Sequence, residues 1–122
     1  MSYFLIFIGG GLGSVVRFAF SKFIQLQPGG FPTATLAANL VSSLILGLLL
    51  GYHFNKQVLN DSTRLFIATG FCGGFSTFST FSYETFMLAS TGNLRMAIVN
   101  LTANFVMCYI AVAAGFLITR FL

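Results

Sequence analysis

Four long apolar stretches leave this chain few choices of fold. They cover residues 3–23, 33–52, 65–89 and 96–119. A helix crosses a bilayer with about 20 predominantly apolar residues, and each stretch reaches that length. Lys and Arg number only six and Asp and Glu two, whereas roughly a quarter of the residues in a soluble domain are charged. We therefore predict an all-α membrane protein in which residues 1–122 form one transmembrane domain of four helices.

Short polar segments separate the predicted helices. The first loop is marked by Pro28, Gly29, Gly30 and Pro32, and the next two have the sequences HFNKQVLNDSTR and STGNLR. The N-terminal stretch lacks the basic segment that opens a cleaved signal peptide, so we expect it to remain as the first span.

The basic residues are divided evenly between the two sides of the predicted bundle. Orientation in a membrane is set by a Lys/Arg bias, which this division does not provide. It therefore predicts insertion in both directions and an antiparallel homodimer with a two-fold axis in the membrane plane. Two bundles can also enclose a path, whereas one four-helix bundle fills its centre with side chains. The two sets are Lys56, Arg64 and Arg120 on one side and Arg17, Lys22 and Arg95 on the other.

The few ionisable residues exclude several functional classes. Six scattered basic residues suit loop anchors, so we expect no nucleic-acid partner. His53 is the single histidine, and Asp61 and Glu84 are the only acids. These residues cannot form a catalytic triad, a carboxylate pair or a metal site built from side chains. We therefore predict that the protein is not an enzyme.

Glycines recur at a spacing of four residues in the first two stretches. The pairs are Gly9 with Gly13 and Gly47 with Gly51. Small residues at this spacing let helices in lipid approach each other closely, so we interpret the pairs as packing contacts. The segment GGGLGS lacks the last glycine of a dinucleotide fingerprint and follows no plausible strand.

Two polar residues lie inside the first two predicted spans. Arg17 is either an anchor that reaches the membrane interface or part of a positive vestibule for anions. Asn39 either bridges two helices or offers its NH2 group to a passing anion. The sequence leaves both pairs of alternatives open.

The third stretch contains glycines that weaken a helix, namely Gly70, Gly73 and Gly74. They favour a break over a simple kink. A break inside a membrane is tolerated where the freed backbone groups find partners or line a cavity. Freed carbonyls suit a hard cation, and the N–H groups of a following helix suit an anion.

Phenylalanine repeats at every third position in GGFSTFSTFS, which spans residues 73–82. On a continuous helix, Phe75, Phe78 and Phe81 form a slowly winding stripe beside serines and threonines. Ring edges carry partial positive charge and hydroxyls supply hydrogen-bond donors, a combination that suits a small anion. Aromatic packing, with the serines bonded back to their own helix, is the alternative.

Three segments in this order resemble the Fluc (CrcB) family of fluoride channels. GGFSTFSTFS is similar to the family signature GGLTTFSTFS, and GGGLGSVVRF is similar to its glycine-rich stretch ending in arginine. FPTATLAANLVSSLILG resembles the family's P-x-G-T-L-x-V-N-x-x-G-S segment. The resemblance implies a dual-topology homodimer in the bacterial cytoplasmic (inner) membrane that exports fluoride passively through two antiparallel pores.

The resemblance also implies which residues form the pore. Phe78 and Phe81 would contact fluoride through their ring edges, with Asn39 beside them. Ser79 and Thr80 would belong to a track of hydroxyl groups.

Further positions are implied outside the pore. Arg17 would face the aqueous vestibule. The backbone carbonyls of Gly73 and Ser76 from both subunits would hold a structural sodium ion at the dimer centre. The chain departs from the family pattern with Ala34 and Ser42 in place of glycine, Ala38 in place of valine and Ser76 in place of threonine.

Two other functions remain as alternatives. A small proton-coupled multidrug exporter needs a carboxylate inside the membrane, usually in the first span. The first span here contains no acid, so only Glu84 could serve, provided that it lies deep and binds a proton. A non-transporting assembly subunit is the third hypothesis.

Overall fold

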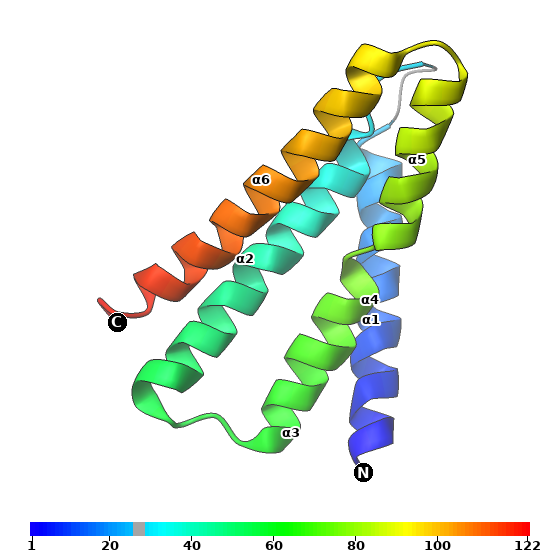
Figure 1. Cartoon of the computed structure of the whole chain (residues 1–122). Helices are drawn as coiled ribbons and strands as arrows, with labels where there is room; N and C mark the ends of the chain where they lie inside the picture. The colour runs from blue at the N-terminus through cyan, green and yellow to red at the C-terminus, as the bar shows by residue number, and fades with distance from the viewer. Residues whose placement is uncertain (26–28) are drawn as a thin grey trace.

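The computed structural model describes residues 1–25 and 29–122, and these two ranges contain helices and no strand. Pro28, which was predicted to mark the first loop, lies outside the described residues. The N- and C-termini lie toward the same end of the molecule (Figure 1). The elements are α1 (Ser2–Phe23), α2 (Thr33–Lys56), α3 (Asp61–Arg64), the π-helix η1 (Leu65–Cys72), α4 (Gly73–Phe75), α5 (Phe78–Ser90) and α6 (Leu94–Ile118).

Three helices, α1, α2 and α6, are long and apolar enough to cross a membrane. α2 continues beyond the predicted end at residue 52 as far as Lys56. The third predicted span, residues 65–89, is divided among η1, α4 and α5. The fourth crossing therefore stays a prediction.

Helices α2 and α6 lie side by side along most of their lengths (Figure 1). Their backbones approach closely at Gly47 and Gly51 of α2 and at Gly115 of α6. A methyl group added at Gly47 would meet the backbone of Val112, and one at Gly115 would lie 2.7 Å from the carbonyl oxygen of Leu44. The interpretation of Gly47 and Gly51 as packing contacts is confirmed.

Helix α1 makes the equivalent contact with η1 and α4. Gly9 and Gly13 of α1 face Gly70 and Gly74, and added methyl groups at any of these four positions would meet backbone atoms of the other segment. Because both partners lack side chains here, the two backbones touch directly. The packing role predicted for Gly9 and Gly13 is confirmed.

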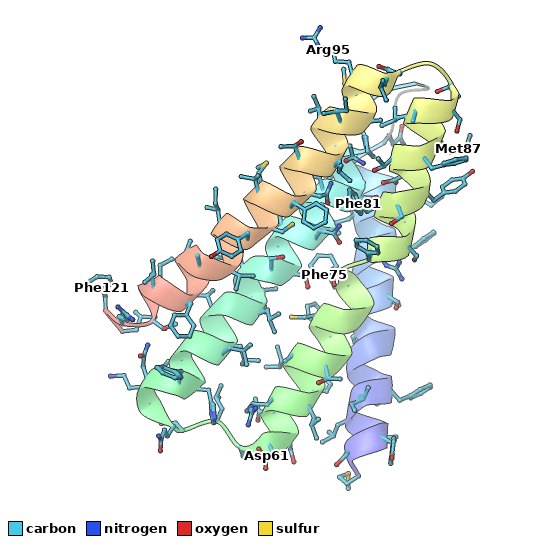
Figure 2. The ribbon with its side chains drawn as sticks, in the orientation of Figure 1. Asp61, Phe75, Phe81, Met87, Arg95 and Phe121 are labelled. Atoms are coloured by element: carbon cyan, nitrogen blue, oxygen red, sulfur yellow. The ribbon has the colours of Figure 1, made fainter. Side chains whose placement is uncertain are left out.

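The outer surfaces of the helices carry large apolar side chains. Such extensive apolar exposure suits contact with lipid or with another membrane protein. Figure 2 shows Arg95 at one end of the helices, and Asp61 and Phe121 toward the opposite end. The exposed side chains include Phe7, Val15, Phe86, Phe105 and Ile110.

Candidate functional site

The helical path is interrupted between α4 and α5. α4 ends at Phe75, and Ser76 and Thr77 adopt extended conformations with ψ angles of 155° and 116° before α5 begins at Phe78. Figure 1 shows the ribbon leaving its helical course at this point. The side chain of Thr77 caps α5, because its hydroxyl accepts a hydrogen bond from the N–H of Thr80.

This interruption corrects the expectation of one phenylalanine stripe. Phe75 belongs to α4 and is 1% exposed, with its ring packed edge-on against Phe20. Phe78 and Phe81 belong to α5, where their ring centroids lie 5.5 Å apart. The stripe was derived for a continuous helix, and the two extended residues separate Phe75 from Phe78 and Phe81 along the chain. Figure 2 shows the Phe75 and Phe81 side chains on either side of the interruption.

Two backbone N–H groups at the interruption bond to side chains. In a continuous α-helix, the N–H of Thr77 would bond to the carbonyl of Gly73, and the N–H of Thr80 to that of Ser76. Instead, the N–H of Thr77 donates to Oδ1 of Asn39 at 2.8 Å, and that of Thr80 donates to Oγ1 of Thr77 at 3.2 Å. The carbonyls of Gly73 and Ser76 thereby become available to other partners, including a hard cation.

The last carbonyl of η1 collects several hydrogen bonds. The oxygen of Cys72 accepts from Oγ of Ser42 at 3.0 Å and from Oγ of Ser76 at 2.8 Å. Ser42 is one of the positions that depart from the family pattern, and its hydroxymethyl group is buried at this contact between α2 and η1. The added side chain is therefore accommodated by a specific bond. Ala34 is the other position where the family pattern has glycine, and it is buried and lines the first of the two cavities described next.

An open cavity of about 350 Å³ lies on one side of the interruption. Arg17 lines it, as do Thr80 and Glu84. Oε1 of Glu84 accepts a hydrogen bond from Oγ1 of Thr35 at 2.8 Å. This cavity therefore places a cation, a carboxylate and hydroxyl groups around one volume. Its remaining lining residues are Ser14, Phe18, Ser21, Ile24, Ala34, Thr35 and Thr77.

A second open cavity, of about 270 Å³, carries no charged side chain among its lining residues. It brings together Asn39 from α2 with Phe78 and Phe81 from α5. The Phe81 ring is 4% exposed and forms a T-shaped pair with the Phe105 ring of α6, with centroids 6.2 Å apart. The other lining residues are Ser43, Ser76, Thr77, Asn104, Phe105 and Cys108.

Thr77 lines both cavities and therefore stands between them. Its hydroxyl lies 3.2 Å from Oγ of Ser79 and 3.1 Å from Oγ1 of Thr80. The predicted pore and vestibule residues that line a cavity thus fall into two groups: Arg17 and Thr80 on the first cavity, and Asn39, Phe78 and Phe81 on the second. Ser79 is exposed and is tied to them through Thr77. Of the two predicted sodium ligands, Ser76 lines the second cavity and Gly73 lines neither.

Two amides of α6 were missed from the sequence. Asn104 lines the second cavity, and Nδ2 of Asn39 donates to its Oδ1 at 3.0 Å. Asn100 is fully buried and accepts from Nδ2 of Asn104. The available signal was the segment NLTAN, which places two amides four residues apart within an apolar stretch, where polar side chains are expensive and usually functional.

Comparison with known proteins places this chain in a family. The family described as CrcB-like protein, Camphor Resistance (CrcB), matches residues 4–116. The chain belongs to the CrcB family. Together with the three apolar helices, this membership shows a multi-pass membrane protein.

Several relatives of this CrcB chain carry the name "Fluoride-specific ion channel FluC". The one from Pyrococcus horikoshii is 41% identical over 116 residues, which cover 95% of this chain and 94% of the relative. The relative from Methanocaldococcus jannaschii is 46% identical over 111 residues, covering 91% and 88% of the two chains. That from Idiomarina loihiensis is 40% identical over 121 residues, covering 97% and 92%.

The described side chains of this CrcB chain form no cluster of typical metal ligands. Within residues 1–25 and 29–122, His, Cys, Asp and Glu form no group of three or more that could hold a metal ion.

Proposed function

We propose that this CrcB chain forms a fluoride-selective channel, which lets fluoride leave a bacterial cell passively across the cytoplasmic (inner) membrane and so relieves fluoride toxicity. The observation that carries the proposal is the second cavity, where Asn39, Phe78 and Phe81 meet without a charged group. The names of the relatives support the same ion.

The chemistry of this cavity suits a small anion. Fluoride holds its water tightly, so a pore must replace that water with several donors while binding the ion weakly at each one. Ring edges of Phe78 and Phe81 offer partial positive charge, and the Asn39 amide offers N–H groups. Chloride is larger and accepts hydrogen bonds more weakly, so the same groups replace its water poorly. Selectivity therefore arises without a fixed cation that would trap the ion.

The first cavity supplies the approach to this site. Arg17 gives it a positive side chain, which raises the local concentration of anions. Thr80, which also lines it, and Ser79 carry hydroxyl groups that hydrogen-bond to Thr77, the residue shared by both cavities. In this proposal, fluoride passes from the vestibule beside Arg17 along these hydroxyls to the phenylalanine rings.

We further propose that two chains assemble as an antiparallel homodimer, with η1, α4 and α5 completing a fourth crossing in each. The Phe78 ring is 71% exposed in one chain, although the proposed role requires it to border a pore. A second chain covering this face would enclose the ring. The even distribution of basic residues supports insertion in both directions.

The interruption also suits a structural sodium ion, which we place at the centre of the proposed dimer. The Thr77 and Thr80 N–H groups, which a continuous helix would direct to the carbonyls of Gly73 and Ser76, are held by side chains instead. Gly73 is exposed, and a methyl group added to it would meet open space in the described part of the chain. These two carbonyls from each chain would hold the ion, which would join the subunits electrostatically.

Fluoride efflux from liposomes that contain the purified protein tests the proposed function. Vesicles loaded with fluoride should release it down its gradient, whereas vesicles loaded with chloride should retain their content. Equal efflux of both ions, or of neither, contradicts the proposal. Proton-driven drug transport that is lost in Glu84→Gln would instead support the exporter, an alternative that the names of the relatives do not favour.

Topology is tested separately from transport. A single cysteine added at the C-terminus, in a variant with Cys72 and Cys108 replaced by alanine, should react with a membrane-impermeant reagent from both sides of the membrane. Reaction from one side only contradicts the antiparallel dimer and leaves the fluoride assay to decide the function.

A further inference from the structure

Three polar side chains connect Asn39 to the backbone of Phe81. Nδ2 of Asn39 donates to Oδ1 of Asn104 at 3.0 Å, and Nδ2 of Asn104 donates to Oδ1 of Asn100 at 3.0 Å. Nδ2 of Asn100 then donates to Oγ1 of Thr85 at 2.8 Å, and this hydroxyl donates to the carbonyl of Phe81 at 2.8 Å. We call these residues, Asn39, Asn104, Asn100 and Thr85, the amide chain.

The hydrogen bonds of the amide chain are all donated in one direction, from Asn39 toward Phe81, and two contacts with backbone groups require this direction. At one end, the backbone N–H of Thr77 can only donate, so Asn39 must turn its oxygen toward it. Toward the other end, the backbone carbonyl of Asn100 can only accept, and Nδ2 of Asn104 donates to it at 3.0 Å. Each constraint alone points Nδ2 of Asn39 toward Oδ1 of Asn104. The orientation of the Asn39 amide is therefore determined twice.

The burial of the two α6 amides indicates more than a packing role. Asn100 is 0% exposed and Asn104 is 6% exposed. Burying an amide is costly unless its hydrogen bonds are made, and a leucine of similar size would pack at no such cost. Both amides form the bonds that their burial demands. A function that depends on the direction of these bonds explains why amides occupy these positions.

One hydrogen of Asn39 remains weakly engaged. Nδ2 of Asn39 lies 3.4 Å from the carbonyl oxygen of Thr77, beyond the usual range of a strong N–H···O bond. Its other hydrogen is used by Asn104 at 3.0 Å. Because Asn39 lines the second cavity, the weakly bonded hydrogen is available to an anion there while the bond to Asn104 orients the amide.

We propose that Asn104, Asn100 and Thr85 are positioning residues for the Asn39 amide. They orient this amide so that one of its N–H groups is available to the anion, and they link it to the helical turn that carries Phe81. This inference rests on the proposed fluoride channel. It assigns to α6 a part in selectivity, although the fluoride contacts come from α2 and α5.

The decisive experiment measures fluoride efflux and the fluoride-to-chloride permeability ratio for Asn104→Leu, alone and combined with Asn39→Ala. An orienting hydrogen bond contributes on the order of a tenfold change. We therefore expect Asn104→Leu alone to lower both quantities about tenfold. Because it acts through Asn39, it should lower neither further in the Asn39→Ala background.

Two further variants keep the test decisive. Thr85→Val conserves the shape of its side chain and removes the last two hydrogen bonds of the amide chain, the one from Asn100 and the one to the Phe81 carbonyl. It should lower the permeability ratio roughly threefold even if Asn104→Leu does not fold. Asn55→Leu is the matched control, because it removes another amide bond between α2 and α6, from Nδ2 of Asn55 to Oγ1 of Thr119 at 3.0 Å. It should leave both quantities unchanged.

The possible results separate the inference from the proposed function. If the unmodified protein passes no fluoride, the proposed function fails and this inference fails with it. If the unmodified protein passes fluoride while Thr85→Val and every folded Asn104 variant behave like it, the positioning role alone is wrong. Independent, multiplicative losses for Asn104→Leu and Asn39→Ala would also overturn it, since they would indicate a structural role for Asn104.

Discussion

The glycine contacts and the interruption provide hydrogen-bond partners for the backbone in different ways. At the glycine contacts, which join α1 to η1 and α4 and α2 to α6, side chains are absent and intact helices touch through their backbones. At the interruption, the helix stops, and Asn39 and Thr77 supply side-chain partners to the backbone N–H groups. Inside a membrane, each backbone polar group needs a partner. We therefore expect the glycine contacts to be sensitive to added size and the interruption to be sensitive to the loss of hydrogen-bonding groups.

The largest effect is expected from adding bulk at a glycine contact. Gly13→Val places methyl groups against the backbone of Phe71 and Gly74, which cannot move aside as a flexible side chain can. We expect the protein to lose stability at the upper end of the roughly 1–3 kcal/mol typical of overpacking. Thermal unfolding in detergent measures this loss.

Gly11→Val is the matched control for this substitution. Gly11 lies on the same helix, and a methyl group added there meets no atom of the described residues within 4 Å. Its unfolding temperature should stay close to that of the unmodified protein. Similar losses for the two variants would mean that helix propensity, and not the backbone contact, determines the effect.

An intermediate effect is expected from polarity changes at Asn39. Asn39→Leu keeps the volume but removes the acceptor of the Thr77 N–H, which should cost about 1–3 kcal/mol of stability. Asn39→Asp retains an acceptor for this N–H and adds a negative charge beside the second cavity. It should fold better than Asn39→Leu and still conduct little fluoride, as efflux from liposomes would show. Normal conduction by Asn39→Asp would refute a donor role for this amide.

The smallest effect on the fold is expected at Gly73. A methyl group at Gly73 meets open space, whereas one at the adjacent Gly74 meets the backbone of Gly10. Gly73→Ala should match or slightly exceed the stability of the unmodified chain, by at most about 1 kcal/mol from its better helix propensity. Gly74→Ala should be clearly less stable. Equal behaviour of the two variants in thermal unfolding would contradict the described packing of α4 on α1.

The glycine contacts could be predicted from the sequence because their signal is local. Spacings of four residues identified Gly9, Gly13, Gly47 and Gly51, and each lies at a helix contact. This spacing can be recognised within a single helix, without knowing which helix packs against it. The apolar lengths of α1, α2 and α6 were likewise visible in the sequence.

The details of the interruption were harder to predict. The stripe of Phe75, Phe78 and Phe81 was wrong because it assumed uniform helical rotation across Ser76 and Thr77. Asn104 was missed because its role depends on which residue of α2 it faces, and that register arises only from packing. Local patterns predict which faces can touch, whereas hydrogen-bond partners between helices follow from the assembled structure.

The central claim is that an uncharged site at the interruption replaces the hydration of fluoride, with the edge of the Phe81 ring as one of its parts. The most direct test is the fluoride-to-chloride permeability ratio of Phe81→Leu in liposomes, because leucine keeps an apolar side chain at this buried position and removes the aromatic edge. We predict that the variant folds but loses most of its fluoride efflux and selectivity. The unmodified protein, measured in parallel, should pass fluoride and exclude chloride. A Phe81→Leu variant with unchanged fluoride efflux and selectivity would contradict the account.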